Sequence, residues 1–395
     1  MITRDYLVIG AGVGGISVCE GIRTYDKRGR IMLVGNENHL PYHRVSLSKA
    51  FLSAKRPHPE ELLVEPAEWY EHHKIDLRLN TVVTQLNLER RLAVLNNGQT
   101  VEFNKACLAT GSRPTRPLVA GANLGNVIYL RTLADALALR EMAELESGVL
   151  IVGGGFIAVE AAAALRQAKR KVGLLAREQH LWQAMLDRET AAWLTEYFRQ
   201  HEVNLYLQES LNGFEGKTVL KNVQTKSGDR ISTALALVAV GTDLNLELVR
   251  NTPLSGPKGT PVTEYLETDE KGIYAVGDIA LYPDRLFGGV RRVDHWDNAR
   301  QQGLLVGANM TGKKRQRYDY LPSYTSQLFD LKWQFLGDFT LPPTRFEIDG
   351  SREKKKFALR FFHNEKLRGA VLCNRSEDEA EEIKKTIRAA YASSK

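Results

Sequence analysis

Three glycines near the start of the chain, Gly10, Gly12 and Gly15, follow the apolar run Tyr6-Leu7-Val8-Ile9 with the spacing Gly-x-Gly-x-x-Gly. Such a turn lets the backbone approach a pyrophosphate, and the helix that follows offers free N–H groups and a positive partial charge. Glu37 lies 22 residues beyond Gly15, close to the distance of about 20 expected for a carboxylate that accepts ribose hydroxyls. This order of features predicts a dinucleotide site.

A second glycine turn, at residues 153–155, follows another apolar run, and Ala158 takes its third motif position, where a methyl group is sometimes accommodated. The position expected to be acidic is Ala176, and Arg177 follows it. A guanidinium pairs with a 2′-phosphate that a carboxylate would repel, so the pattern favours NADPH, with NADH as the alternative. If Arg177 points to solvent, Ala176 only weakens selectivity. The residues expected to bind this dinucleotide are Gly153, Gly155, Ile157, Ala158, Arg177 and Gly241.

Composition excludes several classes of protein. The 395 residues are 43% hydrophobic and 26% charged, which is typical of a soluble globular chain of two or three domains. There is no apolar run of about 18 residues and no signal-peptide pattern at the N-terminus, so we expect a cytoplasmic location without membrane insertion. The three widely spaced cysteines exclude a CxxC pair and zinc-type spacing. The net charge of +7 is too diffuse to indicate nucleic-acid binding.

The elements that position these residues follow from apolar periodicity. Strand, glycine turn, helix and strand over residues 6–35 indicate a βαβ unit with parallel pairing, and the same order restarts at Val149 with a helix over Phe156 to Gln167. The segments around 75–79, 82–88 and 92–95 are expected to be antiparallel additions.

We predict an α/β fold with two Rossmann-like nucleotide-binding domains and a smaller α+β C-terminal domain. The first domain is discontinuous, at residues 1–113 and 243–312, and the second spans 114–242. The third, 313–395, begins at a basic run and ends in a charged helix from Glu377 to Ala392.

Ordered motifs along nearly the whole chain resemble a known family. They include Leu40-Pro41-Tyr42-His43-Arg44-Val45-Ser46-Leu47-Ser48-Lys49, the segments 109–114, 130–136, 155–160 and 273–278, and His295-Trp296-Asp297-Asn298-Ala299. The chain resembles the two-dinucleotide-domain flavoprotein reductases, specifically the oxygenase-coupled ferredoxin, putidaredoxin and rubredoxin reductases, with apoptosis-inducing factor as a relative. It departs from the pattern at Val45-Ser46, where prolines are usual. Ala158 and Ala176 look like the NADPH site of glutathione reductase, whose redox-active cysteine pair is absent.

The resemblance implies FAD in the first site and a nicotinamide dinucleotide in the second. Asp278 matches the carboxylate that binds the ribityl chain, and Arg44 matches an arginine that contacts the pyrophosphate. Thr110 and Gly111 match the segment that closes over FAD, Val83 a backbone contact to adenine, and Trp296 a side chain beside the isoalloxazine.

Lys49 and Glu160 are the two candidate catalytic residues that the resemblance implies. An ion pair between them near flavin N5 would steady the developing charge during hydride transfer and order the nicotinamide ring. The alternative is that Lys49 is simply solvated and that the helix dipole alone favours Glu160 near a helix N-terminus.

These features together predict an FAD-dependent oxidoreductase that takes a hydride from NADPH and passes single electrons to a small acidic iron–sulfur protein, ferredoxin or rubredoxin. Residues 313–395 carry 18 Lys and Arg against 12 Asp and Glu, an excess that would steer an acidic partner. The alternatives are a slowly turning redox-sensing flavoprotein like apoptosis-inducing factor, and the flavoprotein component of a nitrite-reductase-type system. The oligomeric state stays open.

Overall fold

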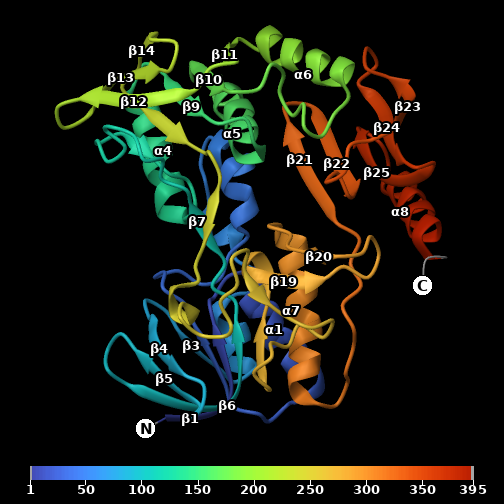
Figure 1. Cartoon of the computed structure of the whole chain (residues 1–395). Coiled ribbons are helices and arrows are strands. Elements are labelled where there is room, and N and C mark those ends of the chain that lie inside the picture. Colours follow the sequence, from blue (N-terminus) through green and yellow to red (C-terminus); the bar gives the residue numbers. More distant parts are fainter. Residues whose placement is uncertain (1, 393–395) are drawn as a thin grey trace. The chain divides into compact units, whose positions relative to one another are not determined.

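The computed structural model describes residues 2–392 and divides the chain into two compact units (Figure 1). The first unit comprises the chain up to His43, Glu60–Arg113 and Leu244–Pro322. The second comprises Arg44–Pro59, Pro114–Asp243 and the chain from Ser323 onward. The three-domain division at 113, 242 and 312 stays a prediction.

The first unit is built on a seven-stranded mixed sheet of order β3-β2-β1-β6-β5-β4, with β18 also paired to β6. Its parallel strands are β1 (Ile2–Ile9), β2 (Ile31–Val34), β3 (Ile75–Arg78), β6 (Thr100–Leu108) and β18 (Ile273–Ala275). The antiparallel strands are β4 (Val83–Asn87) and β5 (Leu92–Leu95), as predicted. The expectation for 75–79 was wrong, because helix α3 (Ala67–His72) returns the chain and β3 pairs parallel to β2.

Two helices of this unit pack closely against each other. Helix α1 (Val13–Tyr25) follows the first glycine turn, and α7 (Trp296–Thr311) lies beside it (Figure 1). A Cβ on Gly21 would lie 2.4 Å from the Leu304 carbonyl oxygen, and one on Gly307 would lie 2.3 Å from that of Val18. Because side chains are absent at both crossing points, the backbones of the two helices touch there.

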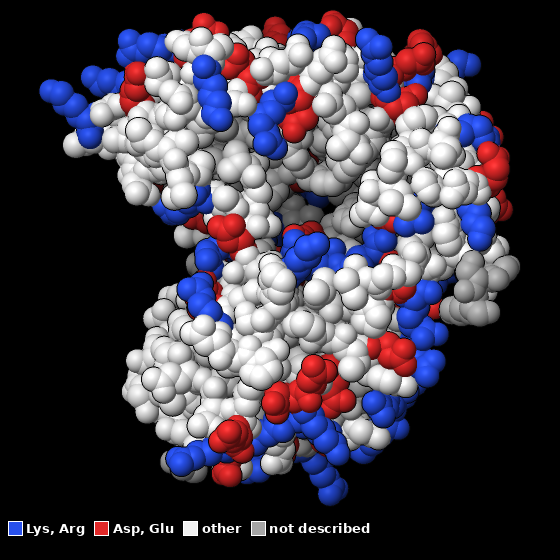
Figure 2. Space-filling model, in the orientation of Figure 1, with Lys and Arg blue, Asp and Glu red and all other residues white. Residues whose placement is uncertain are grey.

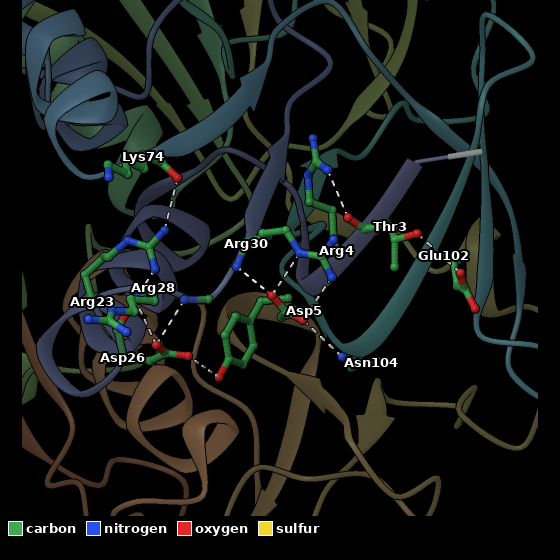
Figure 3. Close-up of polar contacts among 12 residues, drawn as sticks. Thr3, Arg4, Asp5, Arg23, Asp26, Arg28, Arg30, Lys74, Glu102 and Asn104 are labelled. Atoms are coloured by element: carbon green, nitrogen blue, oxygen red, sulfur yellow. Dashed lines mark hydrogen bonds and ion pairs between the residues drawn. The ribbon is translucent and has the colours of Figure 1, made fainter.

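Polar contacts join the middle of β1 to the residue before β2 and to the middle of β6 (Figure 3). Asp5 on β1 accepts hydrogen bonds from the Arg30 backbone N–H, 2.8 Å away, and from the Asn104 side chain on β6, 3.2 Å away. Hydrogen bonds from Arg30 hold the pKa of Asp5 below its ordinary value. Arg23 at the end of α1 donates to the carbonyl of Lys74, next to β3, at 3.0 Å. These contacts align the strands near whose carboxyl ends the glycine turn lies.

The remaining elements of the first unit, and those where the chain passes between units, are short. They are η2 (Pro59–Leu62), β7 (Ser112–Pro114), β16 (Thr242–Leu244), η3 (Glu247–Val249), β17 (Thr260–Pro261), η4 (Gly277–Ile279), β19 (Ala280–Pro283) and β20 (Val290–Arg291).

The second unit contains a five-stranded parallel sheet of order β11-β10-β9-β15-β8. Strand β9 (Val149–Val152) and helix α5 (Phe156–Gln167) have the predicted bounds. The other elements before residue 243 are η1 (Arg44–Ser48), α2 (Ala50–Ser53), β8 (Val127–Ile128), α4 (Leu133–Leu145), β10 (Val172–Ala176), α6 (Arg188–Gln200), β11 (Val203–Leu207), β12 (Leu211–Gly216), β13 (Leu220–Thr225), β14 (Arg230–Ser232) and β15 (Ala236–Val238).

The C-terminal part of the second unit is an antiparallel sheet of order β21-β22-β25-β24-β23 with one long helix on it. This confirms the α+β character predicted for this part of the chain. Its elements are β21 (Ser323–Leu328), β22 (Leu331–Gly337), β23 (Arg345–Ser351), β24 (Lys356–His363), β25 (Lys366–Cys373) and α8 (Glu377–Ala392).

Candidate active site

The first glycine turn has the geometry of a phosphate cradle. Gly10 has φ +115°, and a Cβ there would lie 2.1 Å from the Ala109 carbonyl oxygen. A Cβ on Gly15 would lie 1.9 Å from the carbonyl oxygen of Gly10, so no larger residue fits at either position. At Gly12, the N-cap of α1, a Cβ would meet nothing within 4 Å and no side chain caps the helix. Open space therefore faces the free N–H groups of the helix.

Glu37 lies just beyond the carboxyl end of β2. One of its carboxylate oxygens accepts a hydrogen bond of 2.6 Å from the Tyr42 hydroxyl, which orients the side chain. The Thr81 N–H donates to the Gly35 carbonyl at 2.8 Å, so the segment leading to Val83 runs beside the same strand end. The Val83 side chain is buried in the core of the sheet, which leaves only its backbone for the predicted adenine contact.

Asp278 follows the carboxyl end of β18, in η4. The Ser112 hydroxyl donates to its Oδ2 at 2.6 Å. The preceding residue, Gly277, donates its N–H to the Gln302 side-chain oxygen at 2.7 Å. Ser112 and Gln302 were not predicted as site residues, and their hydrogen bonds fix both the carboxylate and the turn that carries it.

Thr110 and Gly111 are held by Asn245. The Thr110 hydroxyl donates to the Asn245 carbonyl at 2.7 Å, the Asn245 amide donates to the Thr110 carbonyl at 2.8 Å, and the Asn245 N–H donates to the Gly111 carbonyl at 3.0 Å. Trp296 begins α7 and meets the His43 ring edge-on, with centroids 6.4 Å apart. Burial, with a smaller contribution from Arg300, lowers the pKa of His43, which favours its neutral form.

These residues fit FAD in the first unit. The open turn at Gly12 suits a pyrophosphate, and the oriented carboxylates of Glu37 and Asp278 suit ribose and ribityl hydroxyls. Bound FAD supplies the chemistry that the side chains lack, because it accepts electrons in pairs and releases them singly.

The second glycine turn repeats this geometry in the second unit. Gly153 has φ +136°, and a Cβ there would lie 2.2 Å from the Ala239 carbonyl oxygen. Gly155 is the N-cap of α5, again with open space at its Cβ and no side-chain cap. Ala158 is fully buried and Ile157 half-buried. The Gly241 carbonyl accepts the Thr115 N–H at 3.0 Å, which holds the end of the run after β15.

A carboxylate that sequence reasoning missed lies beside this turn. A Cβ on Gly154 would lie 2.5 Å from the Glu178 carboxylate and 3.5 Å from the Cβ of Ala176, whereas Arg177 is exposed. In the first unit, Ala11, which follows Gly10, likewise approaches Gly35, which follows β2. The acidic Glu37 lies two positions beyond Gly35. Glu178 is thus the counterpart of Glu37. Its 20-residue spacing from Ala158 was the available signal.

The ion pair predicted between Lys49 and Glu160 is present in the second unit. Lys49 Nζ lies 3.2 Å from Glu160 Oε1, and the two side chains are 17% and 5% exposed. The Ser48 hydroxyl donates to Glu160 Oε2 at 2.6 Å, and the Ser326 hydroxyl donates to Oε1 at 2.7 Å. Lys49 also donates to the Thr325 carbonyl at 3.3 Å. Glu160 on α5 is therefore contacted by donors from η1, from the residue that follows η1 and from β21.

This cluster holds one positive and one negative charge in fixed positions at the second turn of the nucleotide-binding helix. Because both Glu160 oxygens accept charge-assisted hydrogen bonds, the ionised carboxylate is satisfied and its geometry is restrained. The catalytic roles of Lys49 and Glu160 stay predictions. Arg44 begins η1 and donates to the Arg131 carbonyl at 2.9 Å, and its pyrophosphate contact also stays a prediction.

Comparisons with known proteins agree with this geometry. The family model for pyridine nucleotide-disulphide oxidoreductases matches residues 4–303, and that for the monodehydroascorbate reductase 3-like C-terminal domain matches residues 321–394. Within residues 2–392, no helix has the length and apolar character of a membrane span.

Two curated relatives and one solved structure are similar over most of the chain. The ferredoxin–NAD(+) reductase subunit of a benzene 1,2-dioxygenase system from Pseudomonas putida is 33% identical, over 85% of this chain and 81% of its own. A monodehydroascorbate reductase from Pisum sativum is 31% identical, over 97% and 94%. The ferredoxin reductase for the CYP199A2 system from Rhodopseudomonas palustris is 29% identical, with a TM-score of 0.91 over 96% and 93% of the two chains.

The two glycine turns, the acidic residues beside them and these matches lead to one conclusion. The chain belongs to the pyridine nucleotide-disulphide oxidoreductase family and is an oxidoreductase that uses FAD and NAD(P)H.

Proposed function

We propose that the nicotinamide ring is positioned at the start of α5, beside the Lys49–Glu160 pair, and that the enzyme delivers single electrons to a small acidic iron–sulfur protein. The observation that carries the proposal is the buried ion pair, because hydrogen bonds from the protein itself hold its two charges in position. Preoriented charge needs no reorganisation when hydride transfer redistributes charge nearby. Neither side chain has to donate or accept a proton, since a hydride carries its own electron pair.

The acceptor is proposed from the relatives, two of which are named as ferredoxin reductases. A second candidate is a small organic radical of the monodehydroascorbate type. It is favoured by the match of residues 321–394 to the C-terminal domain of that reductase family and by the similarity to the pea enzyme.

One experiment separates the two acceptors. Steady-state NADH oxidation would be followed with a ferredoxin, with a rubredoxin, and with monodehydroascorbate generated in place from ascorbate. We expect a kcat/KM for an iron–sulfur protein well above that for a non-specific dye. If only the organic radical is reduced faster than the dye, the iron–sulfur proposal is wrong. If reduced protein instead accumulates with a long-lived charge-transfer absorbance and slow turnover, a redox-sensing role replaces both.

The choice of dinucleotide depends on two adjacent side chains of opposite charge. Glu178 lies against Gly154 in the turn, whereas Arg177 is exposed. The sequence-based preference for NADPH rested on the absence of a carboxylate at Ala176 together with the guanidinium of Arg177, and Glu178 supplies a carboxylate two residues after Ala176. A carboxylate there accepts ribose hydroxyls and repels a 2′-phosphate. We therefore propose NADH as the preferred donor, with NADPH as the weaker one.

This proposal is tested by kcat/KM with each dinucleotide. Glu178→Ala should raise the NADPH/NADH ratio at least several-fold, and Arg177→Ala should lower it. The NADH proposal is wrong if the unmodified enzyme prefers NADPH, or if Glu178→Ala leaves the ratio unchanged.

Surface charge bears on the proposal of an acidic partner. On the face drawn in Figure 2, Lys and Arg side chains are interspersed with Asp and Glu. The basic run at 313–317 is partly engaged within the first unit, since Arg315 lies 4.0 Å above the Tyr265 ring and Arg317 pairs with Glu264 at 2.7 Å.

We also propose a cytoplasmic location, because all three cysteines are buried free thiols, as expected in a reducing compartment.

A further inference from the structure

A row of oxidisable side chains crosses the second unit from the nucleotide-binding turn to Tyr197, which is buried and contacts the exposed side chain of Asp330. It consists of Trp182, Trp333, Trp193 and Tyr197, and the ring centroids of successive members lie 5.7, 6.3 and 5.6 Å apart. Trp182 also contacts Phe156, the first residue of α5, with centroids 5.0 Å apart. The row therefore begins one ring away from the glycine turn proposed to bind the nicotinamide dinucleotide.

The inner members of the row cannot retain an oxidising equivalent. Trp182 and Trp333 are 2% and 1% exposed, and neither indole N–H has a hydrogen-bond partner. An oxidised indole becomes neutral only by passing its N–H proton to an acceptor, and none is present at these two positions. Because the positive charge of an oxidised, buried indole is costly, the indole takes an electron from the next ring. The electron vacancy thereby moves to that ring.

Tyr197 at the outer end has the acceptor that the inner residues lack. Its hydroxyl donates to the Asp330 carboxylate, and Lys355 Nζ lies 3.2 Å from the hydroxyl and 2.9 Å from the other Asp330 oxygen. Burial and the Asp330 hydrogen bond raise the pKa of Tyr197 to about 12, so the phenol is protonated at neutral pH. The Asp330 side chain is 59% exposed, which gives the site contact with solvent.

We infer that this row transfers an electron vacancy from the dinucleotide site, ring by ring, to Tyr197 beside the exposed Asp330. An oxygen-centred or substrate-centred radical formed near the turn takes one electron from Trp182 and is reduced to a closed-shell anion. The vacancy moves through Trp333 and Trp193 to Tyr197, whose phenolic proton passes to Asp330 as the electron leaves. A small thiolate then gives one electron to the tyrosyl radical and becomes a thiyl radical, and the proton returns from Asp330 to the phenolate oxygen of Tyr197.

Pulse radiolysis of the holoenzyme with the azide radical tests the inference, because this oxidant removes one electron from tryptophan. We expect tryptophanyl absorbance to decay as tyrosyl absorbance rises, at a rate independent of protein concentration. Tyr197→Phe and Trp193→Phe should each abolish most of this fast phase. Asp330→Asn should slow it at least several-fold. The matched control is Tyr206→Phe, which changes an exposed tyrosine on β11 of the same unit and should leave the phase intact.

A second measurement covers the case in which the fast phase is small. After exposure to the oxidant, mass spectrometry of the Tyr197→Phe protein should show at least several-fold more oxidation at Trp182 and Trp333 than in the unmodified enzyme. The inference is overturned if tyrosyl formation persists in correctly folded, flavin-loaded Tyr197→Phe or Trp193→Phe protein, or if oxidation of the inner tryptophans does not change. Neither readout depends on which acceptor the enzyme reduces.

Discussion

Removing one partner of the Lys49–Glu160 pair leaves the other charged and largely buried, and the structure sets the expected loss of stability. The two charged atoms lie 3.2 Å apart. At an effective dielectric constant of about 20, Coulomb's law gives an attraction of about 5 kcal/mol before desolvation is subtracted. Breaking a buried pair from one side costs about 3–5 kcal/mol. Because Glu160 keeps two serine donors and Lys49 is 17% exposed, we expect about 3 kcal/mol for Lys49→Met or Glu160→Gln.

The double variant leaves neither charge unpaired, so its loss should fall about 2 kcal/mol short of the sum of the single losses. Urea unfolding followed by tryptophan fluorescence measures this, since Trp182, Trp193 and Trp333 all belong to the second unit. The control is the same cycle on Arg199 and Glu196, an ion pair with both side chains more than half exposed, where coupling should stay below about 0.5 kcal/mol.

Additive losses would refute this reasoning, as would single variants that each cost less than about 0.5 kcal/mol. The pair would then not act as one coupled unit. Stopped-flow reduction by NADH adds a functional readout. If hydride transfer in Lys49→Met and Glu160→Gln keeps the unmodified rate, the two residues are structural and their proposed role at the nicotinamide is wrong.

Three further predictions concern the cofactor, the thiols and the partner. Gly15→Ala places a methyl group 1.9 Å from the Gly10 carbonyl oxygen and should yield mostly flavin-free protein, whereas Gly12→Ala should fold normally and lose flavin affinity only in part, as the visible absorbance of purified protein will show. Burial raises the pKa of Cys19 to about 12, so at about pH 8 the thiol stays protonated and should react with a thiol reagent only as the protein unfolds; rapid reaction of the native enzyme would contradict this. Reduction of an acidic iron–sulfur protein should slow several-fold as ionic strength rises, and an equal slowing with a neutral dye would exclude electrostatic steering.

Local patterns in the sequence were sufficient for the repeated nucleotide-binding framework. The glycine spacings, the apolar runs around them and the position of Glu37 all lie within about 30 residues of one another. Each helix or strand can be predicted from its own hydrophobic periodicity and from the turn residues beside it. For this reason β9 and α5 match their predicted bounds residue for residue. The pairing of Lys49 with Glu160 was predicted only through the resemblance to a known family.

Other features depend on segments that are distant in the sequence. The direction of β3 depends on how α3 returns the chain, which alternation within the strand does not encode. Glu178 is an exception, since its 20-residue spacing from Ala158 was a local signal. It was missed because the acidic residue was expected directly after the strand, and the approach of Gly154 shows where the carboxylate lies.

By itself, the sequence determined that this protein has two dinucleotide turns of one architecture, because such turns are local in the chain. Only the tertiary structure decided what surrounds Glu160. Its hydroxyl donors, Ser48 and Ser326, are 112 and 166 residues away along the chain, and no spacing rule connects them. A buried carboxylate must have its hydrogen bonds satisfied, but which residues satisfy it depends on how the chain packs around it.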